Sequence, residues 1–206
     1  MTQESAPASS PRRLWLDILA VVVLSAVAVV TAWCGFQSSK WGGEMSIAFS
    51  QASAARVQAS DAASAVRDQR QIDLTVFAEW LSADYAGDTE LAAFIEQRFP
   101  PSLAAAFDAW DKSTATPFAL PEYVVAGEEE VVELNAKADA AYQRALDNNQ
   151  RGDNYTLLTV LFALALFLSA VAQRAGPDWS RRALLIVALA ITALGLVIML
   201  TFPIRI

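Results

Sequence analysis

Three apolar runs, each long enough to cross a lipid bilayer as a helix, constrain this chain more than any other feature. They are residues 14–36, 155–172 and 183–204. The hydrocarbon core of a bilayer is spanned by about 20 apolar residues in helical conformation. The whole chain is 55% hydrophobic yet 18% charged, which favours membrane spans joined to a water-facing part. The sequence therefore predicts an all-α membrane protein with three transmembrane helices.

The charges beside these runs predict how the chain crosses the membrane. Arginines precede the first run and fill the link between the second and third: Arg12, Arg13, Arg174, Arg181 and Arg182. Cytoplasmic loops carry an excess of Lys and Arg, so residues 1–13 and 173–182 are expected to be a cytoplasmic tail and loop. Residues 37–154 carry nine basic and nineteen acidic side chains, a net charge of −10. This insertion is expected on the extracytoplasmic side of a bacterial cytoplasmic (inner) membrane.

Aromatic residues near the ends of the runs are expected to form a belt at the membrane surface. They are Trp15, Trp33, Trp41, Tyr155 and Trp179, with Gln37, Ser38 and Lys40 expected beside the lipid headgroups. A cleaved secretory leader is the alternative for the first run, because Arg12-Arg13 loosely resembles a twin-arginine signal. The apolar run continues for eight residues past Ala28, at the end of the possible cleavage site, which favours an uncleaved anchor.

Two stretches of the insertion carry small residues at alternating steps of three and four. One runs from Met45 to Val66 and the other from Val131 to Ala145, and this spacing is typical of a coiled-coil seam. Because alanine leaves little room between helices, we expect the two stretches to form a closely packed antiparallel helical hairpin, a long alanine-rich stalk. The predicted helix-packing seam comprises Ala52, Ala55, Ala59, Ala62, Ala138, Ala141 and Ala145. The paired glycines at 42 and 43 are its expected weak point.

Between these stretches, the sequence predicts two short helices that cap the stalk. Asp88 is a suitable N-cap for the first, Pro100-Pro101 ends it, and residues 102–113 form the second. The short helices are expected to fold back on the first long helix and build an apolar core. Its expected members are Ile72, Val76, Phe77, Trp80, Leu81, Leu91, Phe94, Ile95, Phe99, Leu103, Phe107 and Trp110.

The capping region contains the one set of residues that suggests a ligand or partner surface. Trp80, Arg98, Trp110 and Tyr123 are able to line a pocket for an anionic or apolar ligand. Aromatic residues at helical spacing more often form a core, and that interpretation is favoured. The set therefore stays a hypothesis about binding.

The sequence offers little for catalysis. It has no glycine-rich phosphate loop, no nucleophile elbow and no paired cysteines. Cys34 is the only cysteine and is expected to be a buried small residue, and histidine is absent, which removes the main transition-metal ligand. We therefore predict no enzymatic activity, no cofactor and no metal site. The net charge of the insertion disfavours nucleic-acid binding.

Several segments resemble a family of bacterial three-span inner-membrane proteins that carry one large helical extracytoplasmic insertion and have no assigned activity. The segments are TAWCGFQSSKW, QRQIDLTVFAEWLSADYAGDTELAAFIEQRFPPSLAAAFDAW, TPFALPEY and NQRGDNYTLLTVLFALALF. The resemblance covers about residues 31–172. It implies the same arrangement in the membrane and transfers no function.

Two functions from different classes fit the sequence. The first is a non-enzymatic scaffold or assembly protein that presents an acidic helical domain outside the cytoplasmic membrane. Its expected partners are membrane lipid and either further copies of the chain, in a homo-oligomer, or another membrane protein. The alternative is an extracytoplasmic ligand sensor or transporter-accessory subunit. A channel ranks third, because spans two and three contain few polar side chains.

Overall fold

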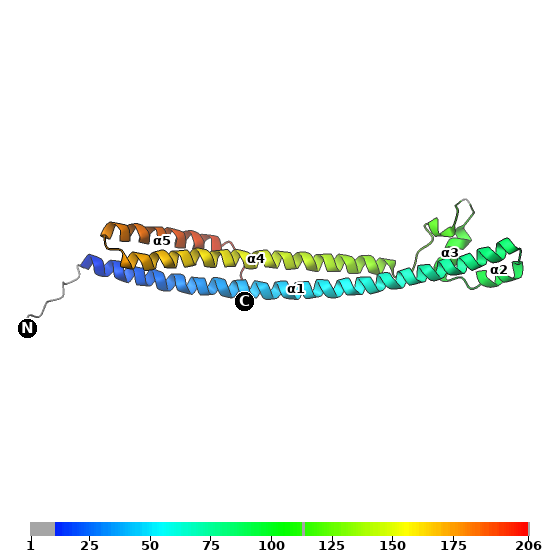
Figure 1. The fold of residues 1–206 in the computed structure, drawn as a ribbon, viewed down its shortest axis with the longest axis horizontal. Coiled ribbons are helices and arrows are strands. Elements are labelled where there is room, and N and C mark those ends of the chain that lie inside the picture. Colours follow the sequence, from blue (N-terminus) through cyan, green and yellow to red (C-terminus); the bar gives the residue numbers. More distant parts are fainter. Residues whose placement is uncertain (1–10, 113, 206) are drawn as a thin grey trace, which may run out of the picture. The chain divides into compact units, whose positions relative to one another are not determined.

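The computed structural model describes residues 11–112 and 114–205, apart from the side chains of residues 11–14, 16 and 17. Every regular element in these ranges is helical (Figure 1). They are α1 (Pro11–Ala86), α2 (Thr89–Glu96), α3 (Pro101–Ala109), the 3₁₀ turn η1 (Pro117–Ala119), α4 (Glu128–Arg174) and α5 (Asp178–Met199). The predicted all-α fold is confirmed. Most of the predicted tail at residues 1–13, and the side chains of Arg12 and Arg13, lie outside the described residues.

Three of these helices, α1, α4 and α5, are long and apolar enough to cross a membrane. The first two are much longer than one crossing needs, at 76 and 47 residues. α1 continues through Gly42 and Gly43 without a break. Each glycine costs a helix only about 1 kcal/mol, and the buried indole of Trp41 beside them supplies packing that offsets this cost.

The chain divides into two compact units. The membrane unit comprises residues 1–48 and 143–206, and the acidic unit comprises residues 49–142. Helices α1 and α4 each contribute residues to both units. The acidic unit carries six basic and sixteen acidic side chains, so it holds a net charge of −10 by itself.

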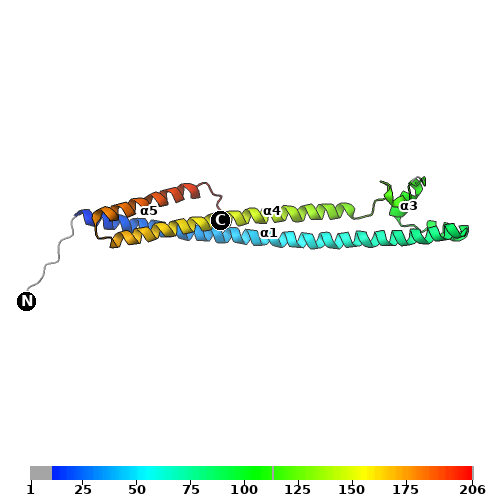
Figure 2. The same cartoon turned by 45° about the horizontal axis from the view of Figure 1, so that its top comes forward.

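In the membrane unit, α5 lies alongside α4 and the first part of α1 (Figures 1 and 2). The core is formed by the inward faces of all three helices: Val23, Val27, Cys34, Tyr155, Leu158, Phe162, Ile191, Ile198 and Met199. Cys34 is buried, as predicted, with Sγ 3.9 Å from Sδ of Met199.

A glycine allows α4 and α5 to approach closely. A Cβ atom added to Gly195 would lie 2.7 Å from the ring of Phe162, a separation that real Cβ atoms do not show. Ala188 lies about two turns earlier on the same face of α5 and is also fully buried. The absence of a side chain at Gly195 therefore lets α5 pack directly against the Phe162 ring of α4.

Polar residues of the membrane unit fix the segment that follows α5. Gln37 is fully buried and its side-chain amide makes a paired contact with the backbone of Arg205, donating to O at 3.0 Å and accepting from N at 2.9 Å. The Arg205 guanidinium also donates to Oε1 of Glu44 at 3.0 Å. Tyr155 donates from its hydroxyl to O of Pro203 at 3.1 Å. The Gln37 amide therefore binds the backbone of the segment after α5.

Two of the five aromatic residues predicted for the belt are buried between helices. Tyr155 is fully buried, with its ring 5.5 Å from that of Phe202, and Trp41 is only 4% exposed. The Arg151 guanidinium lies 4.8 Å from the Trp41 ring, and Gly152 packs on Trp41 Cβ. Trp15, Trp33 and Trp179 are exposed. Both buried rings sit on the inward faces of α1 and α4, where they fill the space between the helices.

In the acidic unit, α1 and α4 lie side by side, and α2 and α3 cover the last part of α1 (Figures 1 and 2). Asp88 caps α2 as predicted, accepting from the backbone N of Leu91 at 3.0 Å. α3 begins at Pro101, where a missing backbone N–H costs nothing, and ends at Ala109 rather than at the predicted residue 113. Trp110 then turns into extended conformation, and Lys112 takes a positive φ.

Four residues of the predicted apolar core are exposed instead. The buried core includes Phe77, Trp80 and Leu103. Four partly buried side chains pack against it: Ile95, Phe99, Phe107 and Trp110. Ile72, Leu81, Leu91 and Phe94 are exposed. α2 has only eight residues and turns its small face inward, with Ala92 buried. Leu91 and Phe94 lie on its other face and cannot reach the core.

Candidate functional site

An aromatic cluster fills the interior of the acidic unit where α1 meets α2 and α3. The Phe77 ring lies 5.7 Å from Trp80 and 5.8 Å from Trp110. Phe107 of α3 contacts Trp80 edge-on at 4.8 Å, and Phe99 contacts Phe107 at 5.1 Å. Offset and edge-on pairs at these separations are favourable beyond the area that they bury. The cluster holds the short helices on α1.

The two tryptophans of the predicted set, Trp80 and Trp110, belong to this cluster. Trp110 is half-buried and donates from Nε1 to O of Thr114 at 3.0 Å, which orders the loop after α3. Trp80 is 5% exposed, and its Nε1 finds no acceptor among the described residues. The structure therefore brings both indoles into core packing.

The remaining two members of the set, Tyr123 and Arg98, lie apart from each other. Tyr123 joins the edge of the cluster through Phe118, whose ring lies 4.9 Å from Tyr123 and 5.3 Å from Phe77. Arg98 is exposed and stacks on the Phe94 ring at 3.6 Å while its Nη1 donates to the Phe94 carbonyl O at 2.8 Å. The arginine is therefore engaged by α2 rather than by the indoles.

A buried carboxylate, which sequence reasoning missed, stands beside the cluster. Asp73 of α1 is fully buried and accepts three side-chain hydrogen bonds. Gln69 Nε2 donates to Oδ1 at 2.9 Å, while the hydroxyls of Ser102 and Tyr123 donate to Oδ2 at 2.6 and 2.9 Å. A buried charge is tolerated only where such partners replace water. Asp73 thus ties α1 to α3 and to the loop before α4.

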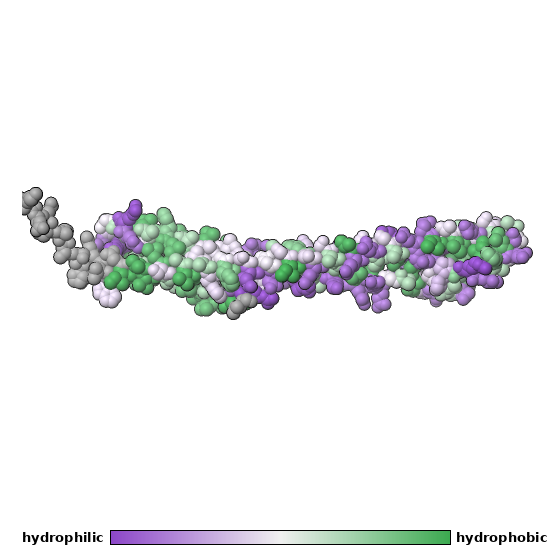
Figure 3. All heavy atoms as spheres, turned by 90° about the horizontal axis from the view of Figure 1, so that it is seen from below, coloured by the Kyte–Doolittle hydropathy of each residue, from purple (hydrophilic) through white to green (hydrophobic). Residues whose placement is uncertain are grey.

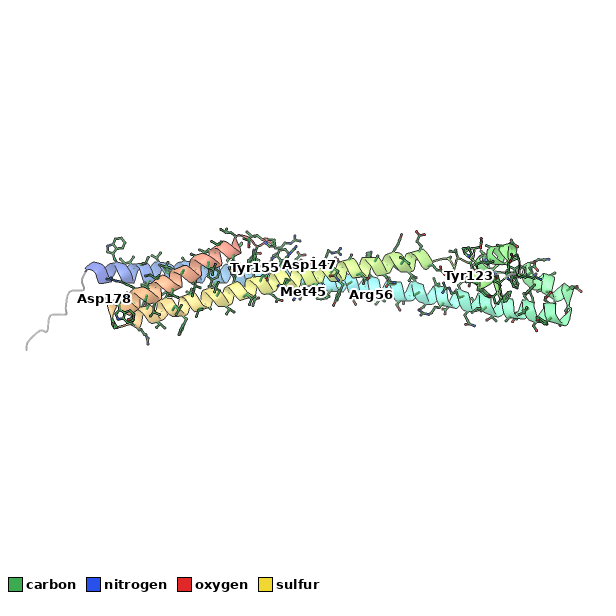
Figure 4. All side chains as sticks on the ribbon, turned by 90° about the horizontal axis from the view of Figure 1, so that it is seen from above. Met45, Arg56, Tyr123, Asp147, Tyr155 and Asp178 are labelled. Atoms are coloured by element: carbon green, nitrogen blue, oxygen red, sulfur yellow. The ribbon has the colours of Figure 1, made fainter. Side chains whose placement is uncertain are left out.

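The environment of Tyr123 keeps its hydroxyl protonated. Burial raises the pKa of Tyr123, and the hydrogen bond to Asp73 and the negative charge of that carboxylate raise it further. Tyr123 lies in the part of the acidic unit where side chains of α1, α3 and the loop meet (Figure 4). It therefore acts as a fixed hydrogen-bond donor over the whole ordinary pH range.

Beside Tyr123, the surface has a shallow hollow with mixed chemistry. It is lined by Arg70, Leu74, Phe118 and Tyr123. Arg70 forms an ion pair with Glu128 at the first turn of α4. The hollow offers a cation and aromatic surface to a small ligand, and Tyr123 is the one member of the predicted binding set that lines it.

Most of the predicted seam alanines are buried. Five are buried in the acidic unit: Ala52, Ala55, Ala59, Ala138 and Ala141. Ala62 is half-buried in that unit, and Ala145 is buried in the membrane unit. Arg56 of α1 reaches across to α4 (Figure 4) and donates to Asn135 Oδ1 at 3.1 Å and to Asp139 Oδ1 at 2.7 Å. The ring of Phe49 meets that of Tyr142 at 5.6 Å. The contact between α1 and α4 therefore consists of alanines packed between the helices and polar groups at its solvent-exposed edge.

The described residues contain no group of three or more His, Cys, Asp or Glu side chains placed to hold a metal ion. Comparisons of the chain with protein-family models, with curated proteins and with solved structures found no match.

Proposed function

We propose that this chain is a non-enzymatic scaffold or assembly protein, anchored in a bacterial cytoplasmic membrane, which presents its acidic unit to partners outside the cytoplasm. The arginine-rich segments around residues 12–13 and 174–182 support an N-terminus in the cytoplasm. The net charge of −10 on residues 49–142 supports a translocated, water-facing unit. Helices α1 and α4, which enter both units, would serve as the anchor and the presenting element together.

The observation that carries this proposal is how the acidic unit uses its side chains. The aromatic cluster and the Asp73 hydrogen bonds serve internal packing. Bulky apolar side chains are meanwhile left on the surface among carboxylates, including Tyr85 at 87% exposure and Val132 at 69%. An acidic surface with exposed aromatic and aliphatic groups is suited to contacts with other proteins.

Self-association, if it occurs, must use residues other than the seam. Ala59 is 3% exposed, because it already packs within the chain. Ala54, on the outer face of α1, is exposed and is available to a neighbouring copy. A bulky residue at position 59 therefore tests folding, whereas one at position 54 tests assembly.

Site-specific photocrosslinking in intact cells tests the proposed function. A photoreactive residue replaces Gln58 or Val132, which are exposed in the acidic unit, and Leu164, which is exposed in the apolar part of α4, serves as the control. The proposal predicts discrete light-dependent protein adducts from positions 58 or 132, and lipid adducts from position 164. Absence of protein adducts from every exposed position of the acidic unit would overturn it.

The hollow beside Tyr123 favours one alternative, an extracytoplasmic ligand sensor or transporter-accessory subunit. Arg70 would contact an anionic group there and Phe118 an apolar one. A panel of small carboxylates and phosphates, added to the detergent-solubilised chain, should raise its unfolding temperature if this is correct. The stabilisation should disappear in Arg70→Gln, while Arg67→Gln, one turn away and exposed, should retain it.

A further inference from the structure

The outer face of α2 exposes large apolar side chains beside carboxylates. Leu91 and Phe94 lie one turn apart and are 45% and 53% exposed. Together with Asp88 and Glu90 they line a shallow hollow. In the space-filling view, hydrophobic and hydrophilic residues are interspersed on the surface of the acidic unit (Figure 3). The hollow therefore combines the apolar side chains of Leu91 and Phe94 with the carboxylates of Asp88 and Glu90.

The contacts within the chain hold this surface in shape. Asp88 accepts from the backbone N of Leu91, so the cap fixes the first turn of α2. Arg98 lies on the Phe94 ring and is tied to the backbone carbonyl of the same residue. Phe94 remains more than half exposed despite this stack. The phenyl group is therefore positioned in advance, which lowers the entropy cost of burying it against a partner.

The negative charge around the hollow favours a positively charged partner. Between residues 79 and 98 the chain carries five carboxylates, all exposed, and one arginine, which is engaged by Phe94. The carboxylates are Glu79, Asp84, Asp88, Glu90 and Glu96. A second acidic unit would bring a further charge of −10, and anionic lipid would also be repelled. The basic segments of the chain itself are those proposed to lie in the cytoplasm.

We propose that the outer face of α2, formed by Asp88, Glu90, Leu91 and Phe94, is a docking site for a cationic amphipathic segment of another protein. A bulky apolar side chain of that segment occupies the hollow over Leu91 and Phe94. Lysine or arginine residues beside it face Asp88 and Glu90. This inference rests on the proposed function and names the partner chemistry and the site that it would use.

A titration with a defined probe tests the inference. The full chain is placed in nanodiscs of zwitterionic phosphatidylcholine, and a fluorescent peptide of leucine and lysine in helical amphipathic spacing is added. The site predicts saturable binding that weakens as salt is raised. A matched peptide with glutamate in place of lysine should not bind. Equal binding of both peptides would overturn the charge argument.

Two surface variants separate the site from general attraction to an acidic protein. Phe94→Ser should weaken binding about tenfold or more, because the phenyl group loses its burial against the peptide. Val57→Ser removes a similarly exposed side chain of α1, one turn from Asp61, and should leave the affinity unchanged. Unchanged thermal unfolding would show that both variants are folded. An equal effect of the two substitutions, or no effect of Phe94→Ser, would contradict the proposal.

Photocrosslinking from position 91 in cells completes the test. An adduct with a different protein, mapped to a lysine- or arginine-rich segment, is the expected result. An adduct with a second copy of the chain would overturn the inference. If position 91 gives no adduct while positions 58 or 132 do, the docking site is wrong and the proposed scaffold function still stands.

Discussion

The contact between α1 and α4 in the acidic unit and the aromatic cluster beside α2 and α3 bring helices together in opposite ways. The first uses alanine, with Ala52, Ala55 and Ala59 buried between helices and little area gained per residue. The second uses large rings, such as Phe77 and Trp80, that cover short helices. An alanine contact depends on close approach and should be sensitive to added volume. An aromatic cluster depends on filled volume and should be sensitive to its removal.

The largest expected effect is at the centre of the cluster. Phe77→Ala removes contacts with Trp80, Trp110 and Phe118, and should lower the free energy of unfolding by about 3–5 kcal/mol. Denaturant unfolding of the detergent-solubilised chain, followed by tryptophan fluorescence, measures it. Phe94→Ala is the matched control, because the same side chain is exposed there, and should change stability by less than about 0.5 kcal/mol. Similar losses in both variants would contradict the assignment of the core.

A slightly smaller loss is expected where the cluster meets the buried carboxylate. Asp73→Ala leaves the donors of Gln69, Ser102 and Tyr123 without their acceptor and should cost about 3 kcal/mol. Asp73→Asn keeps one of the two acceptor oxygens in a side chain of the same shape and should cost less. The same unfolding measurement compares them. If alanine were tolerated as well as asparagine, the hydrogen-bond network would not hold α3 on α1.

Added volume tests the other side of the comparison. Ala59→Leu places a large side chain between α1 and α4 and should destabilise the chain by about 1–3 kcal/mol. Ala54→Leu adds the same volume on the exposed face of α1 and should be within about 0.5 kcal/mol of the parent. Thermal unfolding by circular dichroism gives both values. Equal tolerance at the two positions would show that the helices do not pack through this face.

The smallest effect expected is from a single hydroxyl. Tyr123→Phe removes one donor to Asp73 and should cost about 1 kcal/mol at neutral pH. The pKa of Tyr123 is raised in the folded chain. Its hydroxyl therefore contributes fully to the free energy of unfolding at pH values below about 10, the pKa of tyrosine in the unfolded chain. This contribution is lost as pH rises above that value, because only the unfolded chain then releases the proton. Stability measured above pH 10 should fall more steeply in the parent than in Tyr123→Phe. Parallel pH curves would contradict this account of the hydrogen bond.

Hydrophobic spacing was sufficient to predict the long elements of this fold. Steps of three and four residues place Val23, Val27, Cys34 and Trp41 on the inward face of α1, and continue through the buried alanines. The same steps from Val66 reach Phe77 and Trp80. Three runs of sufficient apolar length also predict the three helices able to cross a membrane. These features depend only on local periodicity and on the length of the apolar runs.

The features that sequence reasoning missed are polar residues at inward positions and apolar residues at outward ones. Gln37 and Asp73 occupy the three-four spacing of α1, and that register was the available signal for their burial. Their partners, Arg205 and Tyr123, lie far along the chain and could not be assigned without the fold. Phe94 was expected in the core because of its type. Its exposure depends on the short length of α2, which presents only one narrow face to α1.

We propose that the acidic unit lies outside the cytoplasm, and thiol labelling in spheroplasts measures this location. Cys34 is replaced by serine to remove the native thiol, which is buried in any case. Single cysteines then replace Asp111 in the acidic unit or Ser180 at the start of α5. A membrane-impermeant thiol reagent is expected to modify position 111 in intact spheroplasts, and position 180 only after lysis. Modification of position 180 with protection of position 111 would contradict it.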